Sequence, residues 1–148
     1  MSTTPQPHGQ LFVPSGNSAG DVRRAFLQIA DVIDRHPDEG KSDAGAEVAN
    51  VRRFTLQVQS RRGRARSGRF VVLVWVTTAD GGGPGGAQTV ATVAGTVLVT
   101  ITANQAWQML TDSSGKIQLD VTIAGAATRY LGYAVLGRGQ QSAAVAWT

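Results

Sequence analysis

The feature that most constrains the fold is a change of hydrophobic period after Val48. From there on, apolar and polar residues alternate, most clearly in Phe54–Gln59 and Ile117–Ile123. A period of two is typical of strands with one buried face. Turn-forming residues interrupt this pattern about every ten residues. The sequence therefore predicts a mainly β domain over residues 48–148, an antiparallel β-sandwich of seven or eight short strands.

Two of the expected strands flank a run of arginines. The first is Phe54–Gln59, and the second is Phe70–Val76, which is continuously apolar and so is expected to be buried on both faces. We expect the two strands to form a hairpin with the arginines at its tip. The remaining strands are expected at Thr89–Val93, Thr96–Thr102, Ala106–Thr111, Lys116–Ile123, Arg129–Leu136 and Gln140–Trp147.

The segment before Val48 has a different organisation. Residues 1–20 form a polar extended arm with one apolar triplet, and Asp21–His36 has apolar residues at steps of three and four, as in one amphipathic helix. Pro37 ends this helix, and residues 37–46 are expected to be a polar linker. The predicted division is an arm at 1–20, a helix and linker at 21–47, and a sandwich at 48–148. The apolar anchors of the arm and helix are Leu11, Phe12, Val13, Phe26, Ile29 and Ile33.

Composition excludes several classes of site. The 148 residues include no cysteine, so disulfides, thiolate metal sites and cysteine nucleophiles are excluded. The longest strongly apolar run, Phe70–Val76, is far shorter than the ~20 residues needed to span a bilayer. The first residues lack the cationic start and apolar stretch of a signal peptide, so we expect a soluble, non-secreted product with no membrane partner.

The charges are sorted along the chain. Residues 1–50 carry four basic and seven acidic groups, residues 51–69 carry seven arginines and no acid, and residues 70–148 carry three of each. The net charge of +4 therefore comes from one arginine block. The members of its loop are Arg61, Arg62, Arg64, Arg66 and Arg69.

Two partners fit the arginine loop. Guanidinium groups bind nucleic-acid phosphates, but no aromatic residue lies between Arg61 and Arg69 to stack on bases. The same groups also pair with carboxylates of another protein. The acidic N-terminal region of a second copy has the required charge. We favour protein contact, with nucleic-acid binding and a merely solvated loop left open.

No catalytic or metal-binding constellation stands out. Asp31, Asp34, His36, Asp38 and Glu39 are the one acid–histidine cluster, and they fit a solvated helix face better than a metal or acid–base site. Gly81–Gly86 precedes a strand and lacks the following Lys-Ser or Lys-Thr of a phosphate-binding loop. The three tryptophans are interpreted as core or interface filling. We expect no enzyme activity, no cofactor and no metal.

The C-terminal half resembles a known class of module. Leu110-Thr-Asp-Ser-Ser-Gly115, the alternating strand to Ile123, Gly125 and Thr128-Arg-Tyr130 resemble the closing half of bacterial immunoglobulin-like modules. The stretch from Phe70 to Thr148 also looks like small β-rich proteins of tailed-bacteriophage virions, through its Val-Trp-Val strand, its Gly/Pro loop and Thr96–Asn104. The chain lacks the cysteine pair of antibody-type domains, so the resemblance is to the bacterial and phage kind.

The resemblance implies a structural role. It implies an immunoglobulin-like sandwich and a non-enzymatic virion component, first a capsid-bound decoration or stabilising protein and second a tail- or fibre-associated one. The expected partners are other virion structural proteins and further copies of the chain in a homo-oligomer. The expected location is the virion, assembled in the host cytoplasm. A basic nucleic-acid-binding module is the alternative from a different class.

Overall fold

The computed structural model describes residue 23 and residues 39–148. Arg23 is helical and exposed, and residues 39–148 contain strands, turns and loops but no helix. The strands are β1 (Glu39–Ala44), β2 (Val51–Gln59), β3 (Val71–Thr77), β4 (Thr89–Ala94), β5 (Thr96–Thr102), β6 (Ala106–Leu110), β7 (Lys116–Thr122), β8 (Ala127–Val135), β9 (Arg138–Gln141) and β10 (Val145–Trp147).

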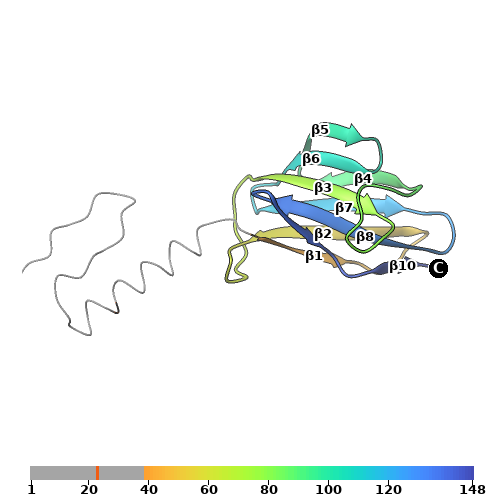
Figure 1. The fold of residues 1–148 in the computed structure, drawn as a ribbon, viewed down its shortest axis with the longest axis horizontal. Coiled ribbons are helices and arrows are strands. Elements are labelled where there is room, and N and C mark those ends of the chain that lie inside the picture. The colour runs from red at the N-terminus through yellow and green to blue at the C-terminus, as the bar shows by residue number, and fades with distance from the viewer. Residues whose placement is uncertain (1–22, 24–38) are drawn as a thin grey trace, which may run out of the picture.

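The strands form two antiparallel sheets. The first has the order β1-β2-β7-β4, and the second has the order β10-β8-β3-β6-β5, with β9 also paired to β8 (Figure 1). The chain passes between the sheets repeatedly, for example at Gly95, whose φ of 90° lets it leave β4 for β5 at once. The expectation of a mainly β, antiparallel sandwich is confirmed for the described residues.

The core lies between the sheets and follows the period of two. Strand β2 contributes Phe54, Leu56 and Val58, each at most 1% exposed. Strand β7 contributes Ile117, Leu119 and Val121 in the same way, and sheet 2 adds the inward residues of β3, β6 and β8. The outer face of sheet 1 is polar, with Arg53 directly opposite Asp120. Alternation therefore predicted the buried face of these strands correctly.

The tryptophans occupy two kinds of position. Trp107 and Trp147 are core residues, 7% and 2% exposed, and Trp147 lies 6.2 Å from Phe54 between ring centroids. Trp75 faces outward on sheet 2, where its Nε1 donates to the Gly82 carbonyl at 3.2 Å. Core filling is thus confirmed for two of the three tryptophans.

The expectation that β3 is buried on both faces is wrong. Val72, Val74 and Val76 are fully buried, but the alternate residues Val71 and Leu73 are 49% and 39% exposed. A continuous apolar run predicts a strand covered on both sides. In this structure the inner face alone is covered by the other sheet, so the outer face remains apolar and open.

The predicted linker at residues 37–46 and the boundary at 48 are also corrected. Residues Glu39–Ala44 form the edge strand β1, in register with Gln59 to Phe54 of β2. Gly40 secures it, because its N–H donates to Gln140 Oε1 at 2.7 Å and its carbonyl accepts from the Tyr133 hydroxyl at 3.1 Å. The sandwich therefore includes Glu39–Ala44. The predicted arm and, apart from Arg23, the predicted helix lie outside the described residues.

The last predicted strand is divided into two. Instead of one strand over Gln140–Trp147, β9 and β10 pair with successive parts of β8, and residues 142–144 separate them. The Ser142 hydroxyl accepts the Leu131 N–H at 2.9 Å, and the Ser142 N–H donates to the Leu131 carbonyl at 2.9 Å. Two hydrogen bonds therefore hold Ser142, between β9 and β10, against β8.

We predict that Leu56→Ala lowers the free energy of unfolding by about 2–5 kcal/mol, because it empties a fully buried site between the sheets. Urea denaturation followed by tryptophan fluorescence measures this loss. Leu136→Ala is the matched control, because Leu136 is 67% exposed. The control should change the free energy by less than about 0.5 kcal/mol, and equal losses would contradict the assigned core.

Candidate functional site at the arginine end

The loop of residues 60–70 leaves the end of β2 and enters β3, so it crosses from one sheet to the other (Figure 1). The predicted hairpin is therefore wrong. β2 pairs with β1 and β7, whereas β3 pairs with β6 and β8. The five arginines lie on an inter-sheet crossing, where both sheets end.

The first part of the loop is a tight turn. The Ser60 N–H donates to the Arg64 carbonyl at 2.8 Å, and the Gly63 N–H donates to the Ser60 carbonyl at 2.8 Å. Gly63 has a φ of 74°, a value that glycine adopts without the steric cost of a side chain. Ser60 is fully buried, and Gln59 forms a β-bridge with Ala65. This turn presents Arg61, Arg62 and Arg64 as exposed residues at its surface.

The second part of the loop is fixed through the backbone of Arg66. Its N–H donates to the Val58 carbonyl at 2.9 Å, and its carbonyl accepts from Gln57 Nε2 at 3.2 Å. Gly115 lies directly against that carbonyl, because a Cβ on Gly115 would lie 1.9 Å from the Arg66 oxygen. The path of the loop therefore depends on the absence of a side chain at position 115.

The third part is fixed by Thr111, which is fully buried. Its hydroxyl donates to the Gly68 carbonyl at 2.9 Å and accepts the Phe70 N–H at 2.8 Å. The Gly68 N–H donates to the Ser113 carbonyl at 2.9 Å. Three separate anchors therefore hold the loop of residues 60–70, which lowers the ordering entropy that a partner would otherwise have to overcome.

The turn that supports this loop has an acidic centre. Asp112 Oδ1 accepts hydrogen bonds from the Ser114 hydroxyl at 2.7 Å, the Ser114 N–H at 2.9 Å and the Lys116 N–H at 3.0 Å. These bonds, the hydroxyl first, hold the pKa of Asp112 below its ordinary value. Gly115 has a φ of 78°, a value that glycine adopts without the steric cost of a side chain. The turn joins β6 to β7 and so crosses between the sheets.

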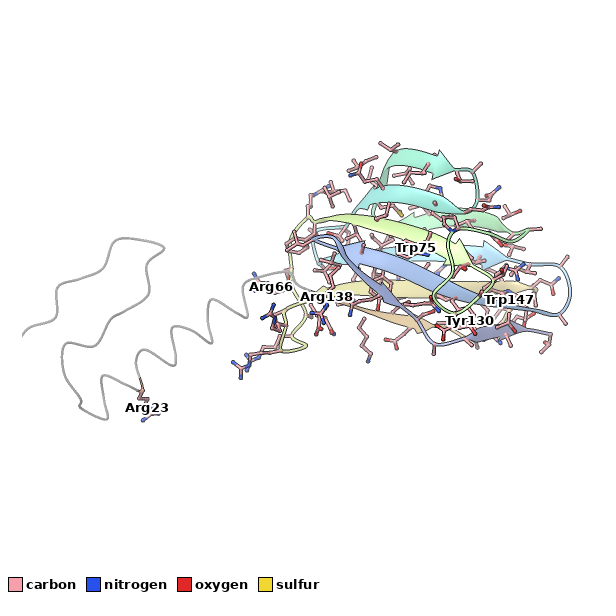
Figure 2. The ribbon with its side chains drawn as sticks, in the orientation of Figure 1. Arg23, Arg66, Trp75, Tyr130, Arg138 and Trp147 are labelled. Carbon is pink, nitrogen blue, oxygen red and sulfur yellow. The ribbon has the colours of Figure 1, made fainter. Side chains whose placement is uncertain are left out.

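One further arginine lies at the same end, which we call the arginine end: Arg61, Arg62, Arg64, Arg66, Arg69 and Arg138. Figure 2 shows Arg66 and Arg138 at this end of the sandwich. Arg138 begins β9 after a turn in which Leu136 and Gly137 have positive φ. Arg66 is partly buried and its Nε has no hydrogen-bond partner. Sequence alone does not place Arg138 here, because its position at this end depends on the pairing of Val135 with Val72.

The other two arginines of the sequence block have separate roles. Arg53 makes a two-pronged ion pair with Asp120, at 2.7 and 2.9 Å, and this pair holds the pKa of Asp120 below its ordinary value. Arg52 donates to the Gly45 carbonyl at 3.0 Å, lies 3.7 Å from Glu47 and stacks 5.8 Å from the Trp147 ring centre. Trp147 is at the opposite end of the sandwich from Arg66 (Figure 2). Of the seven arginines in residues 51–69, five therefore lie in the loop at the arginine end, and Arg52 and Arg53 lie on β2.

The other predicted site residues fall outside the described residues. They are the anchors of the arm and helix, namely Leu11, Phe12, Val13, Phe26, Ile29 and Ile33. Within residue 23 and residues 39–148, no three His, Asp or Glu side chains gather as metal ligands would. The same residues include no helix long and apolar enough to cross a membrane.

Comparisons with known proteins assign the chain to no family. No family model matches it, and no curated protein matches it. Among solved structures, a chain titled BspA_C_WT is similar with a TM-score of 0.30 and 10% sequence identity, over 73% of this chain. The match covers 49% of that chain, so this protein spans about half of its length.

We predict that Gly115→Ala destabilises the protein more than Gly125→Ala. Both glycines have positive φ, so each substitution costs about 1–2 kcal/mol of backbone strain. Position 125 has open space around it, whereas a Cβ at position 115 meets the Arg66 carbonyl. The clash adds about 1–3 kcal/mol, measurable as a lower free energy of unfolding in urea. Equal losses for the two variants would contradict the anchoring of the loop by Gly115.

We predict that stability falls as the pH is lowered from about 5 to about 2, and falls less steeply in Asp112→Asn. A carboxyl whose pKa is lowered by folding stabilises the protein above its ordinary pKa and loses this contribution as it is protonated. The asparagine oxygen can still accept the two N–H bonds, but it has no charge to lose. Thermal unfolding at a series of pH values measures the slope, and an unchanged slope would contradict this role for Asp112.

Proposed function

We propose that this protein is a non-enzymatic structural component of a tailed-bacteriophage particle that docks its arginine end on an acidic surface of another structural protein. The observation that carries the docking proposal is the anchored crossing loop. It presents Arg61, Arg62 and Arg64 on a turn closed by Ser60. Arg66 and Arg69 belong to the same loop, and Arg138 lies at the same end of the sandwich (Figure 2).

The chemistry of the loop favours carboxylates over bases. Guanidinium groups bind carboxylates through two parallel hydrogen bonds, and such charge-assisted bonds are stronger than neutral ones. The Arg53–Asp120 pair already forms this geometry elsewhere in the protein. Base stacking needs exposed aromatic rings, and residues 61–69 include none. Phe70, the next aromatic residue, packs against the core.

The particle assignment rests on the sequence resemblance in residues 70–148. Under this proposal the sandwich is an immunoglobulin-like module and the chain is a capsid-bound decoration or stabilising protein. A tail- or fibre-associated component is the second choice. The proposal includes no catalytic step and no cofactor, and it takes other virion proteins and further copies of the chain as partners.

Nucleic-acid binding is the competing function for the same arginines. It predicts affinity for duplex DNA that falls steeply with salt, with a slope that becomes shallower by about one for each phosphate-binding arginine removed. Carboxylate binding predicts tighter association with an acidic polypeptide than with DNA at the same salt. A series of salt titrations with duplex DNA and with an acidic polypeptide therefore distinguishes the two functions.

We predict that Arg61→Ser combined with Arg62→Ser weakens binding to a glutamate-rich peptide by about tenfold or more, because charge-assisted hydrogen bonds are lost. Fluorescence anisotropy of the labelled peptide at several salt concentrations measures this. The control combines Ala124→Glu and Ala126→Glu, two exposed residues that follow β7 at the opposite end of the sandwich, and lowers the net charge by the same amount. The control should change affinity by less than about twofold, since exposed charges elsewhere are screened.

Two outcomes contradict the docking site. If the control weakens binding as much as the arginine variant, the peptide responds to net charge instead of the arginine end. If a DNA duplex binds more tightly than the peptide and loses about two units of salt slope in the arginine variant, the nucleic-acid alternative replaces the proposal.

We predict for the particle that a phage encoding the same arginine variant assembles without this chain, which mass spectrometry of purified particles detects. The variant should keep the unfolding midpoint of the wild type, because Arg61 and Arg62 are exposed. Normal incorporation of the variant would contradict the arginine end as the docking surface. Absence of the wild-type chain from particles would contradict the virion assignment itself.

A further inference from the structure

Exposed apolar residues gather on one side of the sandwich. Nine large apolar side chains of the described residues are exposed, and only Val48 and Leu136 lie away from β3, β4 and β5. The other seven are Val71, Leu73, Val93, Val97, Leu98, Val99 and Ile101. We call the four on β5, from Val97 to Ile101, together with Leu73, the apolar edge. Clustered exposure of this kind marks interaction surfaces.

Strand β5 is an edge strand without charged residues or proline. It pairs only with β6, and all seven of its residues are exposed. Natural edge strands are usually blocked by charged residues or proline. Here no Lys, Arg, Asp or Glu occurs between Gly81 and Thr111, and β5 contains no proline. The strand therefore lacks the charges and prolines that keep many sheet edges from associating.

A preformed hollow adjoins the edge on the outer face of sheet 2. It has a volume of about 390 Å³, and Leu73, Trp75 and Ile101 line it together with Ala106 and the 81–84 loop. Trp75 is fixed there by its bond to the Gly82 carbonyl, and Gly132 leaves room beneath its ring, because a Cβ would lie 2.1 Å from Trp75 Cε2. An apolar side chain from a partner would therefore find a rigid apolar site.

We propose that the apolar edge is a self-association surface, occupied by β5 of a second copy running antiparallel to the first. The sequence of β5, Thr-Val-Leu-Val-Thr-Ile-Thr, is nearly symmetric about Val99. A two-fold axis at Val99 places Thr96 opposite Thr102, and Val97 opposite Ile101. The same patch then contacts itself, as a closed dimer requires.

The distribution of charge also permits a second copy as the occupant. The positive charge of the chain is concentrated in one arginine block, so a contact that brings two such blocks together is repulsive. The neutral stretch from Gly81 to Thr111 is free of this repulsion. The strands of sheet 1 carry charges of both signs, among them Lys41, Arg53 and Asp120, so its outer face is not a neutral surface of this kind.

The two bulges of β5 decide how the contact is made. Its ladder with β6 shifts register between Val97 and Val99 and again between Thr100 and Thr102. Bulges disfavour the addition of a long regular strand. The side chains of the apolar edge, instead of an unbroken row of backbone hydrogen bonds, therefore make most of the contact between the two copies.

The first test is sedimentation velocity from about 1 to 200 µM, a range in which mass action reveals dimerisation. The wild type should be dimeric in this range. Leu98→Lys combined with Ile101→Lys should weaken the dimer by about 100-fold, because it places lysines on the apolar edge of both copies. The control combines Val48→Lys and Leu136→Lys, which adds the same charge at exposed positions elsewhere, and it should remain dimeric.

A second test does not depend on the lysine variant folding. The chain has no cysteine, so Val99→Cys introduces a single thiol next to the proposed two-fold axis. A residue on a two-fold axis lies opposite its own copy, so the two introduced thiols meet there, and a disulfide joins them when their Cα atoms are about 4.4–6.8 Å apart. Mild oxidation should produce a covalent dimer from Val99→Cys and not from Val48→Cys.

Three results would overturn the self-association proposal. These are a wild type that stays monomeric at about 200 µM, a lysine variant that folds and remains dimeric, or equal cross-linking of the two cysteine variants. Monomeric wild type would assign the apolar edge to a different protein partner. The variant with Arg61→Ser and Arg62→Ser should stay dimeric, so failure of this proposal and failure of docking through the arginine end are separate results.

Discussion

The packing of two one-sided sheets against each other is the constraint on which the rest of the structure depends. Phe54, Leu56 and Val58 of β2 face Val72 and Val74 of β3 across the interior, and all five are at most 1% exposed. Burial of this apolar area is the main stabilising contribution to folding. It requires the chain to cross between the sheets several times, and each crossing must satisfy its own backbone groups near the core.

The arginine end is a consequence of one such crossing. The loop from β2 to β3 has its polar groups satisfied by Ser60, Gln57 and Thr111, and it passes over Gly115 where no side chain blocks its path. The backbone of the loop is therefore held by hydrogen bonds within the sandwich, and Arg61, Arg62 and Arg64 are exposed at its surface. The apolar edge is a second outward surface, of the opposite chemistry, on β5 and the outer face of sheet 2.

The sequence predicted which face of a strand is buried better than it predicted which strands pair with each other. Alternation in Phe54–Gln59 and Ile117–Ile123 identified which side chains are buried, and the residue types of Asp112–Gly115 identified a turn. Period alone does not say which strand pairs with which, so β2 and β3 were joined as a hairpin although they belong to different sheets. The sequence did not predict strand β1, because the glycine and charged residues of Glu39–Ala44 are typical of a linker. Arg138 could not be placed at the site without the β8–β3 register.

The proposal that a loop held by the sandwich presents arginines to an acidic partner is tested by amide hydrogen exchange, resolved by residue and measured with and without a glutamate-rich peptide. In the free protein the Arg66 and Gly68 amides should be protected, because both donate to backbone carbonyls. The peptide should slow exchange further in residues 61–69 and at Arg138, and leave β7 unchanged. Unprotected Arg66 and Gly68 amides would contradict the anchored loop, and peptide-induced protection away from the arginine end would contradict docking through it.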